Sequence, residues 1–202
     1  MSKPTIGLCI ISPDKPTAKR VIDRYSQYFD EVYLELTPNI KNFANARNKG
    51  LKKVKTQYWC WIDSDDDIKN PENIPKLIEI LEKENLDAVY LPYEYMKNDN
   101  GDVVAYQWRE RIMRTAHPFK WVGAIHETVT SKQQPQATKS ELVTISHNHT
   151  EDDSKRSIER NFIRGSSSFH SDIAIARFAQ LRNPTPFFNS IRPRPASASA
   201  KP

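Results

Sequence analysis

The feature that most constrains this chain is a short hydrophobic run that ends in a group of carboxylates. Residues 58–62 have the sequence Y-W-C-W-I, and aspartates follow at positions 63, 65, 66 and 67. The run is too short for a buried helix and has the length and aromatic content of a strand that is covered on both faces. In open α/β sheets ligands bind at the carboxyl ends of the strands, so these aspartates mark a candidate binding site.

Two of these aspartates, Asp63 and Asp65, are separated only by Ser64. At the end of a strand their carboxylates can bracket a hard divalent cation such as Mg²⁺ or Mn²⁺, which prefers oxygen ligands and often binds substrate phosphates as well. The alternative for so short a motif is a solvated acidic turn that caps the next helix. The hydrophobic strand before it and the polar residues further along the chain favour the metal site.

Strand-like and helix-like segments alternate through the first part of the chain. Strands are predicted over residues 5–11, 31–36, 58–62 and 87–92, and helices over residues 17–29, 43–54 and from about 71. This alternation implies right-handed crossovers, and hence an α/β fold with a mainly parallel sheet and helices on both faces. A hairpin and two more strands then predict a small antiparallel extension. They span residues 90–96 paired with 103–108, then 119–125 and 142–146.

The cysteines and the hydropathy pattern predict a soluble, cytoplasmic protein. Cys9 and Cys60 both lie in apolar strand-like runs, so we expect buried thiols of a reduced compartment and neither a disulfide nor a metal pair. No secretory signal and no apolar run of membrane-spanning length is present, so we expect no membrane insertion.

The net charge of +5 is placed unevenly along the chain. From Lys155 onward there are nine Lys and Arg residues against two acidic ones, which leaves a net charge of −2 for residues 1–154. We predict a main domain over residues 1–150, a helical segment over 151–182, and a basic tail rich in Pro, Ala and Ser, disordered, over 183–202. The basic end keeps a second class of function open, namely nucleic-acid binding.

Five sequence blocks follow one another with characteristic spacing. They are F-A-N-A-R-N at 43–48, W-C-W-I-D-S-D-D at 59–66, R-I-M-R at 111–114, W-V-G-A-I-H-E at 121–127 and I-S-H at 145–147. In this order they resemble glycosyltransferase family 2, and more narrowly its bacterial and phage branch that includes the peptide S-glycosyltransferases. The resemblance covers residues 4–163 and implies a GT-A (Rossmann-like) fold for residues 1–150, a nucleotide-sugar donor, a divalent metal, inversion at the anomeric carbon, and the cytoplasm of a bacterial or phage-infected cell.

The resemblance also implies roles for single residues. Asp65 is similar to the principal metal ligand of the family, and Asp63 to a second carboxylate nearer the ribose. His147 resembles the late histidine that reaches back to the metal or the donor pyrophosphate. Arg47 resembles the arginine that lies against the nucleotide.

The family pattern has one departure and leaves the phosphate contacts open. Where related enzymes have an aspartate that meets the nucleotide base, this chain has the segment L-E-L-T-P-N, in which Glu35 or Asn39 is a candidate substitute. Arg111 or Arg114 can supply forked donors to the donor phosphates. The alternative for both arginines is a surface ion pair.

An inverting transfer also needs a base that takes the proton of the acceptor. Glu127 is the first candidate, because a carboxylate whose pKa is raised by partial burial suits that role. His126 is a candidate to orient Glu127, to be the base itself, or to bind the acceptor. Asp66 and Asp67 remain rivals for the base. Trp121 is either a core residue or a platform for the acceptor.

These inferences predict a metal-dependent, inverting glycosyltransferase. The cofactor is Mn²⁺ or Mg²⁺, and the donor is a nucleotide-sugar, with a UDP-hexose favoured by the family. The acceptor is open between a peptide or protein, a saccharide and a modified DNA base, and a second copy of the chain is one candidate partner. The alternative is a nucleic-acid-binding protein or a non-catalytic GT-A-like protein that uses the basic tail.

Overall fold

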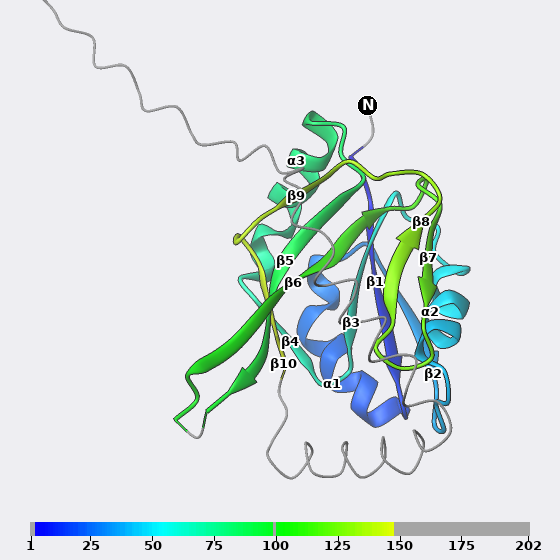
Figure 1. The fold of residues 1–202 in the computed structure, drawn as a ribbon, viewed down its shortest axis with the longest axis vertical. Helices are drawn as coiled ribbons and strands as arrows, with labels where there is room; N and C mark the ends of the chain where they lie inside the picture. Colours follow the sequence, from blue (N-terminus) through cyan, green and yellow to red (C-terminus); the bar gives the residue numbers. More distant parts are fainter. Residues whose placement is uncertain (1–2, 99, 148–202) are drawn as a thin grey trace, which may run out of the picture. The chain divides into compact units, whose positions relative to one another are not determined.

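The computed structural model describes residues 3–98 and 100–147, apart from the side chain of Met96 (Figure 1). The predicted helical segment (151–182) and the predicted basic tail (183–202) lie outside these residues. Within them, the larger sheet has eight strands in the order β2-β1-β3-β6-β5-β10-β4, with β9 paired to β5. The bounds are β1 Ile6–Ser12, β2 Glu31–Leu36, β3 Tyr58–Asp63, β4 Asp66–Lys69, β5 Ala88–Lys97, β6 Val103–Arg114, β9 Ala137–Lys139 and β10 Thr144–His147.

The pairing of the strands confirms an α/β fold with an antiparallel extension. β1 runs parallel to both β2 and β3, and β5 runs parallel to β9 and β10. β6 is antiparallel to its neighbours β3 and β5, and β4 is antiparallel to β10. A separate two-stranded hairpin consists of β7 (Phe119–Val122) and β8 (Thr128–Ser131).

The three α-helices among the described residues cover both faces of the sheet, as predicted. They are α1 (Lys15–Tyr25), α2 (Phe43–Leu51) and α3 (Ile74–Lys83), with short 3₁₀ turns at Ser26–Tyr28 and Pro71–Asn73. Two of the helices, α1 and α2, begin at side-chain caps. The Asp14 carboxylate accepts from Thr17 N (2.8 Å), and the side-chain oxygen of Asn42 accepts from Asn45 N (2.8 Å). Such caps satisfy backbone donors that the first turn of a helix leaves unpaired.

Two hydrophobic cores lie on opposite faces of β3. Tyr58, Cys60 and Ile62 pack with apolar residues of α1 and α3, whereas Trp59 and Trp61 pack with residues of α2 and β7. Alternate side chains of a strand point to opposite faces, so one strand contributes to both cores. The prediction of a strand covered on both faces is therefore confirmed.

Several predicted boundaries change in the structure. The strand expected over residues 119–125 ends at Val122 and turns back as β8, so His126 and Glu127 lie on the connection between the two strands. The helix expected over residues 17–29 stops at Tyr25 and continues as a 3₁₀ turn. β4, which begins directly at Asp66, was not among the predicted strands.

The predicted thiols are present, and no membrane-spanning helix is found in the described part. Cys60 is buried and Cys9 half-buried, and both are free. Among residues 3–98 and 100–147, no helix combines the length and the apolar character that crossing a bilayer would require.

Gly7→Ala is expected to destabilise the fold by about 1–3 kcal/mol, because it overpacks the core. A Cβ at Gly7 would lie 2.3 Å from Cε2 of Tyr33 and 2.7 Å from Oγ1 of Thr56. The ring of Tyr33 is held in place, since its hydroxyl accepts a hydrogen bond from Lys55 N (2.8 Å). Urea unfolding monitored by tryptophan fluorescence measures the change in the free energy of unfolding.

Gly50→Ala is the matched control for this substitution. A Cβ at Gly50, in α2, would come no closer than 3.8 Å to a neighbouring atom. Alanine is favoured over glycine in a helix by up to about 1 kcal/mol, so this variant is expected to be as stable as the wild type or more stable. Equal effects of the two substitutions would contradict the predicted clash.

Candidate active site

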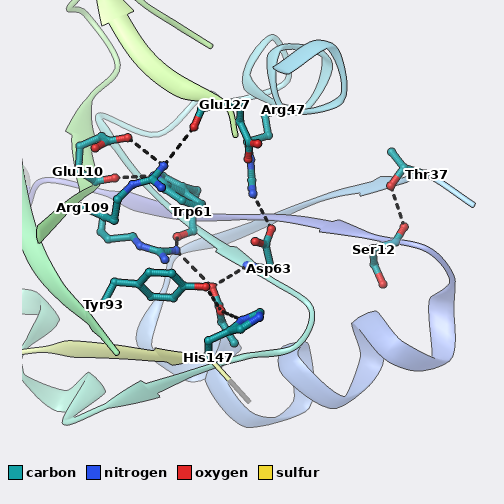
Figure 2. A network of polar contacts seen from close by, with 12 residues as sticks. Ser12, Thr37, Arg47, Trp61, Asp63, Tyr93, Arg109, Glu110, Glu127 and His147 are labelled. Carbon is teal, nitrogen blue, oxygen red and sulfur yellow. Dashed lines mark hydrogen bonds and ion pairs between the residues drawn. The ribbon is translucent and has the colours of Figure 1, made fainter. Parts of the chain in front are cut away.

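The carboxyl ends of β1, β2 and β3 meet at one edge of the sheet. Ile11 is in register with Asp63, and Ser12 with Leu36. The chain leaving β2 is tied to this edge, since Thr37 N donates to Ser12 O (2.8 Å). Figure 2 shows Ser12, Thr37 and Asp63 along this edge. The aspartates thus emerge where ligands bind in open α/β sheets, as the sequence predicted.

A tight turn brings three candidate metal ligands together. The chain turns at Ser64 and Asp65 and returns as β4, which pairs with β10 so that Asp66 stands opposite His147. The ligand atoms of Asp65, Asp66 and His147 all lie within 4.8 Å of one another, and we name these three residues the carboxylate–histidine cluster. Two ligands of one Mg²⁺ or Ca²⁺ ion, each about 2.0–2.6 Å from it, lie at most about 4–5 Å apart.

Asp66 is the fully buried centre of a hydrogen-bond network. Its carboxylate accepts from the backbone N–H of Asp63 (3.1 Å), the Tyr93 hydroxyl (3.3 Å) and Nη1 of Arg111 (3.3 Å), and lies 3.0 Å from Nδ1 of His147. Burial alone would raise the pKa of Asp66, but the contacts with His147 and Arg111 hold it below its usual value. Because Nδ1 of His147 faces Asp66, a metal bound by this histidine would use Nε2, an arrangement in which the carboxylate orients the ring.

Burial and neighbouring charges shift the pKa values of the other two members of the cluster. Burial, together with the negative charges of Asp63 and Asp66, raises the pKa of Asp65 to about 6. Burial would lower the pKa of His147, but the hydrogen bond that its ring donates to Asp66 and the charges of both Asp65 and Asp66 raise it. A bound cation reverses both effects, because carboxylate and imidazole ligands must be deprotonated to bind.

A second charged group lies next to the first and joins three distant segments of the chain. Arg47, on α2, donates from Nη2 to Oδ1 of Asp63 (2.6 Å) and from Nε to Oε1 of Glu127 (2.7 Å). Its guanidinium packs against the rings of both Trp61 and Trp121, 4.4 and 4.9 Å from their centroids. We name Arg47 with Asp63 and Glu127 the Arg47 bridge; Figure 2 shows it beside Trp61.

The expected reason for assigning Glu127 as the base is wrong. Burial would raise the pKa of Glu127, but the positive charge and hydrogen bond of Arg47 hold it below the ordinary value of a glutamate. Glu127 is therefore ionised at neutral pH. The preceding residue, His126, is exposed and has a left-handed backbone with φ of 57°. Such backbone conformations are uncommon outside glycine and cluster at functional sites.

Arg111 reaches the network because β6 contains a bulge. Between the pairs Val89–Ile112 and Tyr90–Glu110, β6 has one residue more than β5, and this extra residue is Arg111. A bulge changes the direction of a side chain relative to regular alternation. The side chain of Arg111 is only 1% exposed and binds the buried Asp66, so it has no free path to a ligand.

Two predicted contacts of the donor are bonded to residues outside these groups. Arg114 pairs with Glu82, and its strand partner in the sheet is Tyr58, at the opposite end of β3 from the aspartates. Glu35 is buried and bonded to Lys49 and to Nζ of Lys53 (2.6 Å). We therefore leave Arg114 and Glu35 out of the candidate site.

The remaining predicted residues have structural partners. Asp67 contacts Arg24, and its Oδ1 accepts from the hydroxyl of Tyr25 (2.8 Å), so it faces α1. Asn39 is exposed in the turn that follows β2. Trp121 is 2% exposed and belongs to the core, which decides against a platform open to the acceptor.

Two residues of the site were not predicted from the sequence. Tyr93 contributes its hydroxyl to Asp66, and only the pairing of β5 with β10 brings it there. Asn48 ties α2 to β7, since its amide donates to Trp121 O (2.9 Å) and accepts from Trp121 N (3.0 Å). The position of Asn48 directly after Arg47, in one of the five blocks, was the available signal.

Comparisons with known proteins find several similar solved structures and one matching family model. Among solved structures, the chain is similar to S. aureus TarS 1-349 in complex with UDP-GlcNAc (14% identity over 68% of this chain and 59% of that chain, TM-score 0.39). It is also similar to HddC from Yersinia pseudotuberculosis (10% identity, 76% and 98% covered, TM-score 0.42). A third is a glycosyltransferase involved in the glycosylation of the major capsid of PBCV-1 (18% identity, 55% and 60% covered, TM-score 0.35).

The chain spans only part of the S. aureus TarS structures that it matches. It covers 47%, 37% and 59% of three structures of S. aureus TarS. A search of curated proteins finds no match. The family model described as glycosyl transferase family 2 matches residues 9–151, which is well over half of the chain and includes both charged groups. Together with the α/β sheet, this match confirms the predicted GT-A fold, and the chain belongs to glycosyl transferase family 2.

Proposed function

We propose that this chain is a metal-dependent, inverting glycosyltransferase that transfers a sugar from a nucleotide-sugar to a hydroxyl or thiol acceptor. A UDP-hexose is the donor that the family resemblance favours. The observation that carries the proposal is that two charged groups converge at the carboxyl end of β3. These groups are the carboxylate–histidine cluster and the Arg47 bridge. Asp63 of the bridge is only two residues from Asp65 of the cluster.

The proposed step moves one proton and one sugar. The acceptor oxygen or sulfur attacks the anomeric carbon from the face opposite the diphosphate, and the bond between that carbon and the phosphate oxygen breaks. The electron pair of this bond leaves with the diphosphate, while the acceptor proton passes to the carboxylate of Glu127. A correctly placed base contributes about 10²–10⁴-fold to the rate.

The structure favours Glu127 over its rivals for the base. Its carboxylate is ionised at neutral pH, and it lies beside Asp63 through their shared arginine. Asp66 is fully buried and engaged by Arg111, and Asp67 faces α1. His126, exposed and adjacent to Glu127, is the residue that we propose to face the acceptor.

The carboxylate–histidine cluster fits a divalent cation by its chemistry. Its donor atoms are carboxylate oxygens and one imidazole nitrogen, of which the oxygens suit Mn²⁺ and Mg²⁺. Asp65 and His147 would hold the ion, and Asp66 would orient His147. When bound, the ion would offset the negative charge that develops on the leaving diphosphate. We propose that Asp63 faces the ribose of the donor.

A thermal-shift screen tests the proposal without knowledge of the acceptor. Purified protein is melted with nucleotides and nucleotide-sugars, with and without Mn²⁺. A true donor at about 100 times its Kd adds about 2.7 kcal/mol, which is about 5–11 °C for a domain of this size. The gain should be absent with EDTA and much smaller for a nucleoside monophosphate. Equal melting temperatures for every nucleotide, with or without Mn²⁺, would contradict the proposed function.

A further inference from the structure

The contacts of Arg47 differ from those of an arginine that meets a nucleotide. Its side chain is only 5% exposed, and its Nε and Nη2 are both bonded to carboxylates. The rings of Trp61 and Trp121, which are edge-to-face with each other, both pack against the guanidinium. A planar guanidinium in such a setting is fixed in position and orientation, because each contact constrains a different direction.

We propose that Arg47 is a positioning residue that holds the base Glu127 in place, and not a contact of the nucleotide. The inference rests on the proposed function for the identity of the base. It departs from the role that the family resemblance implies for this arginine.

The protein holds the main chain of Glu127 as firmly as its side chain. Both β7 and the connection that follows it are tied to α2, since Asn48 bonds Trp121 of β7 and Phe43 N donates to Ala124 O of the connection (3.0 Å). From the other side, Nη2 of Arg109 donates to Glu127 O (3.3 Å). A catalytic group on a connection needs such support, since misplacement by about 1 Å can cost about 10²-fold in rate.

Sharing one guanidinium between two carboxylates solves a problem that a buried base creates. When Glu127 accepts a proton it becomes neutral, and a buried arginine paired with it alone would lose its counter-charge. Such an uncompensated buried charge is strongly unfavourable. Asp63 remains bonded to Arg47 after the transfer, so the guanidinium stays paired throughout. Proton transfer therefore does not leave a lone buried charge.

The charges around Glu127 come from three elements. Arg47 approaches from α2, Arg109 from β6, and Asp63 from β3 across the guanidinium of Arg47. The exposed His126 precedes it on the same connection. The two arginines favour the carboxylate, whereas Asp63 opposes it and competes for the same guanidinium. Removal of Arg47 and removal of Asp63 should thus move the titration of Glu127 in opposite directions.

The main test replaces Arg47 with lysine, which keeps the positive charge but lacks the rigid planar fork that fixes both carboxylates. The sugar-transfer rate is measured from pH 4 to 9. In Arg47→Lys, kcat should fall by about 10²-fold, and the acid limb of its pH profile should move upward, by less than the about 1–3 pH units expected for complete loss of the charge. KM for the donor should change little. Arg24→Lys, which alters an exposed arginine of α1, is the matched control and should leave both kcat and the acid limb unchanged.

Two results would overturn the inference. A raised KM for the donor with an unchanged kcat would show that Arg47 contacts the nucleotide after all. A reduced kcat with an acid limb that stays in place would show a merely structural role. Melting curves of the variants are recorded alongside, so that loss of the fold is not mistaken for either result.

Carbon-13 NMR of the glutamate carboxyls separates this inference from the proposed function, because it needs no activity. The resonance of Glu127 is assigned by its loss in Glu127→Gln. Its titration midpoint should rise in Arg47→Lys and fall in Asp63→Asn, where Arg47 is no longer shared. If Arg47→Lys does not fold, Asp63→Asn alone decides, and an unchanged or higher midpoint in it would overturn the inference.

Discussion

Asp65→Asn is expected to lower Mn²⁺-dependent sugar transfer by about 10³-fold or more while leaving the apo protein at least as stable as the wild type. The loss of activity follows because an amide is a poor substitute for an anionic ligand, and charge stabilisation by a bound metal contributes several kcal/mol to such reactions. The stability follows from the pKa of about 6 for Asp65. Since this pKa is raised on folding, the ionised carboxylate is unfavourable in the apo protein at neutral pH.

The two effects of Asp65→Asn are measured by transfer rates over a Mn²⁺ titration and by melting curves in EDTA and in Mn²⁺. The wild type should gain melting temperature with Mn²⁺, and the variant should gain little. Asp23→Asn is the control, because Asp23 is exposed on α1 and pairs with Lys19 (2.5 Å) away from the site. Retained activity in Asp65→Asn would exclude the carboxylate–histidine cluster as the metal site.

The order of elements up to β3 could be predicted because it follows from local patterns. The apolar run at residues 58–62 is flanked by polar residues, and its observed strand, Tyr58–Asp63, differs by one residue from the predicted one. β2 has the predicted bounds, Glu31–Leu36. Hydrophobic periodicity and capping residues act within one element, so a single sequence contains the information for them.

Elements that depend on distant partners could not be predicted in the same way. β4 has the sequence D-D-I-K, which has little intrinsic preference for a strand, and it forms one because β10 pairs with it from nearly eighty residues away. The bulge at Arg111 likewise arises from the register between β5 and β6. Regular alternation would have placed Arg111 on the same face as Arg109.

The residues of the site were easier to select than their roles. Glu127 and Arg47 were both singled out by their blocks, but no sequence pattern indicates that they bond each other across 80 positions. That bond reverses the expected shift in the pKa of Glu127. Partners also decided against Arg114, which an ion pair with Glu82 holds at the far end of β3. The sequence therefore indicates which residues belong to the site. Their electrostatic roles depend on which residues pair in three dimensions.

Asp66→Asn is expected to reduce the free energy of unfolding by about 3–5 kcal/mol, the largest loss of stability we predict for one substitution. The side chains of Asp66 and Arg111 are 0% and 1% exposed, so the substitution leaves a buried guanidinium without its carboxylate. The Asp66 carboxylate acts solely as an acceptor, for example from Tyr93 and Arg111. An asparagine would have to turn its NH₂ group, a donor, towards some of these donors. Urea unfolding at pH 7 measures the loss.

A double-mutant cycle shows whether that loss comes from the unpaired charge. Arg111→Met removes the guanidinium and fills similar space, so Asp66→Asn should cost much less in this background than in the wild type. The control pair is Lys19 and Asp23, whose side chains are 72% and 58% exposed, and whose coupling should stay below about 0.5 kcal/mol. Additive effects of the two buried substitutions would mean that Asp66 stabilises the fold through its other contacts. The rise in the pKa of His147 would then be the first effect to examine, because Asp66 is its main hydrogen-bond partner.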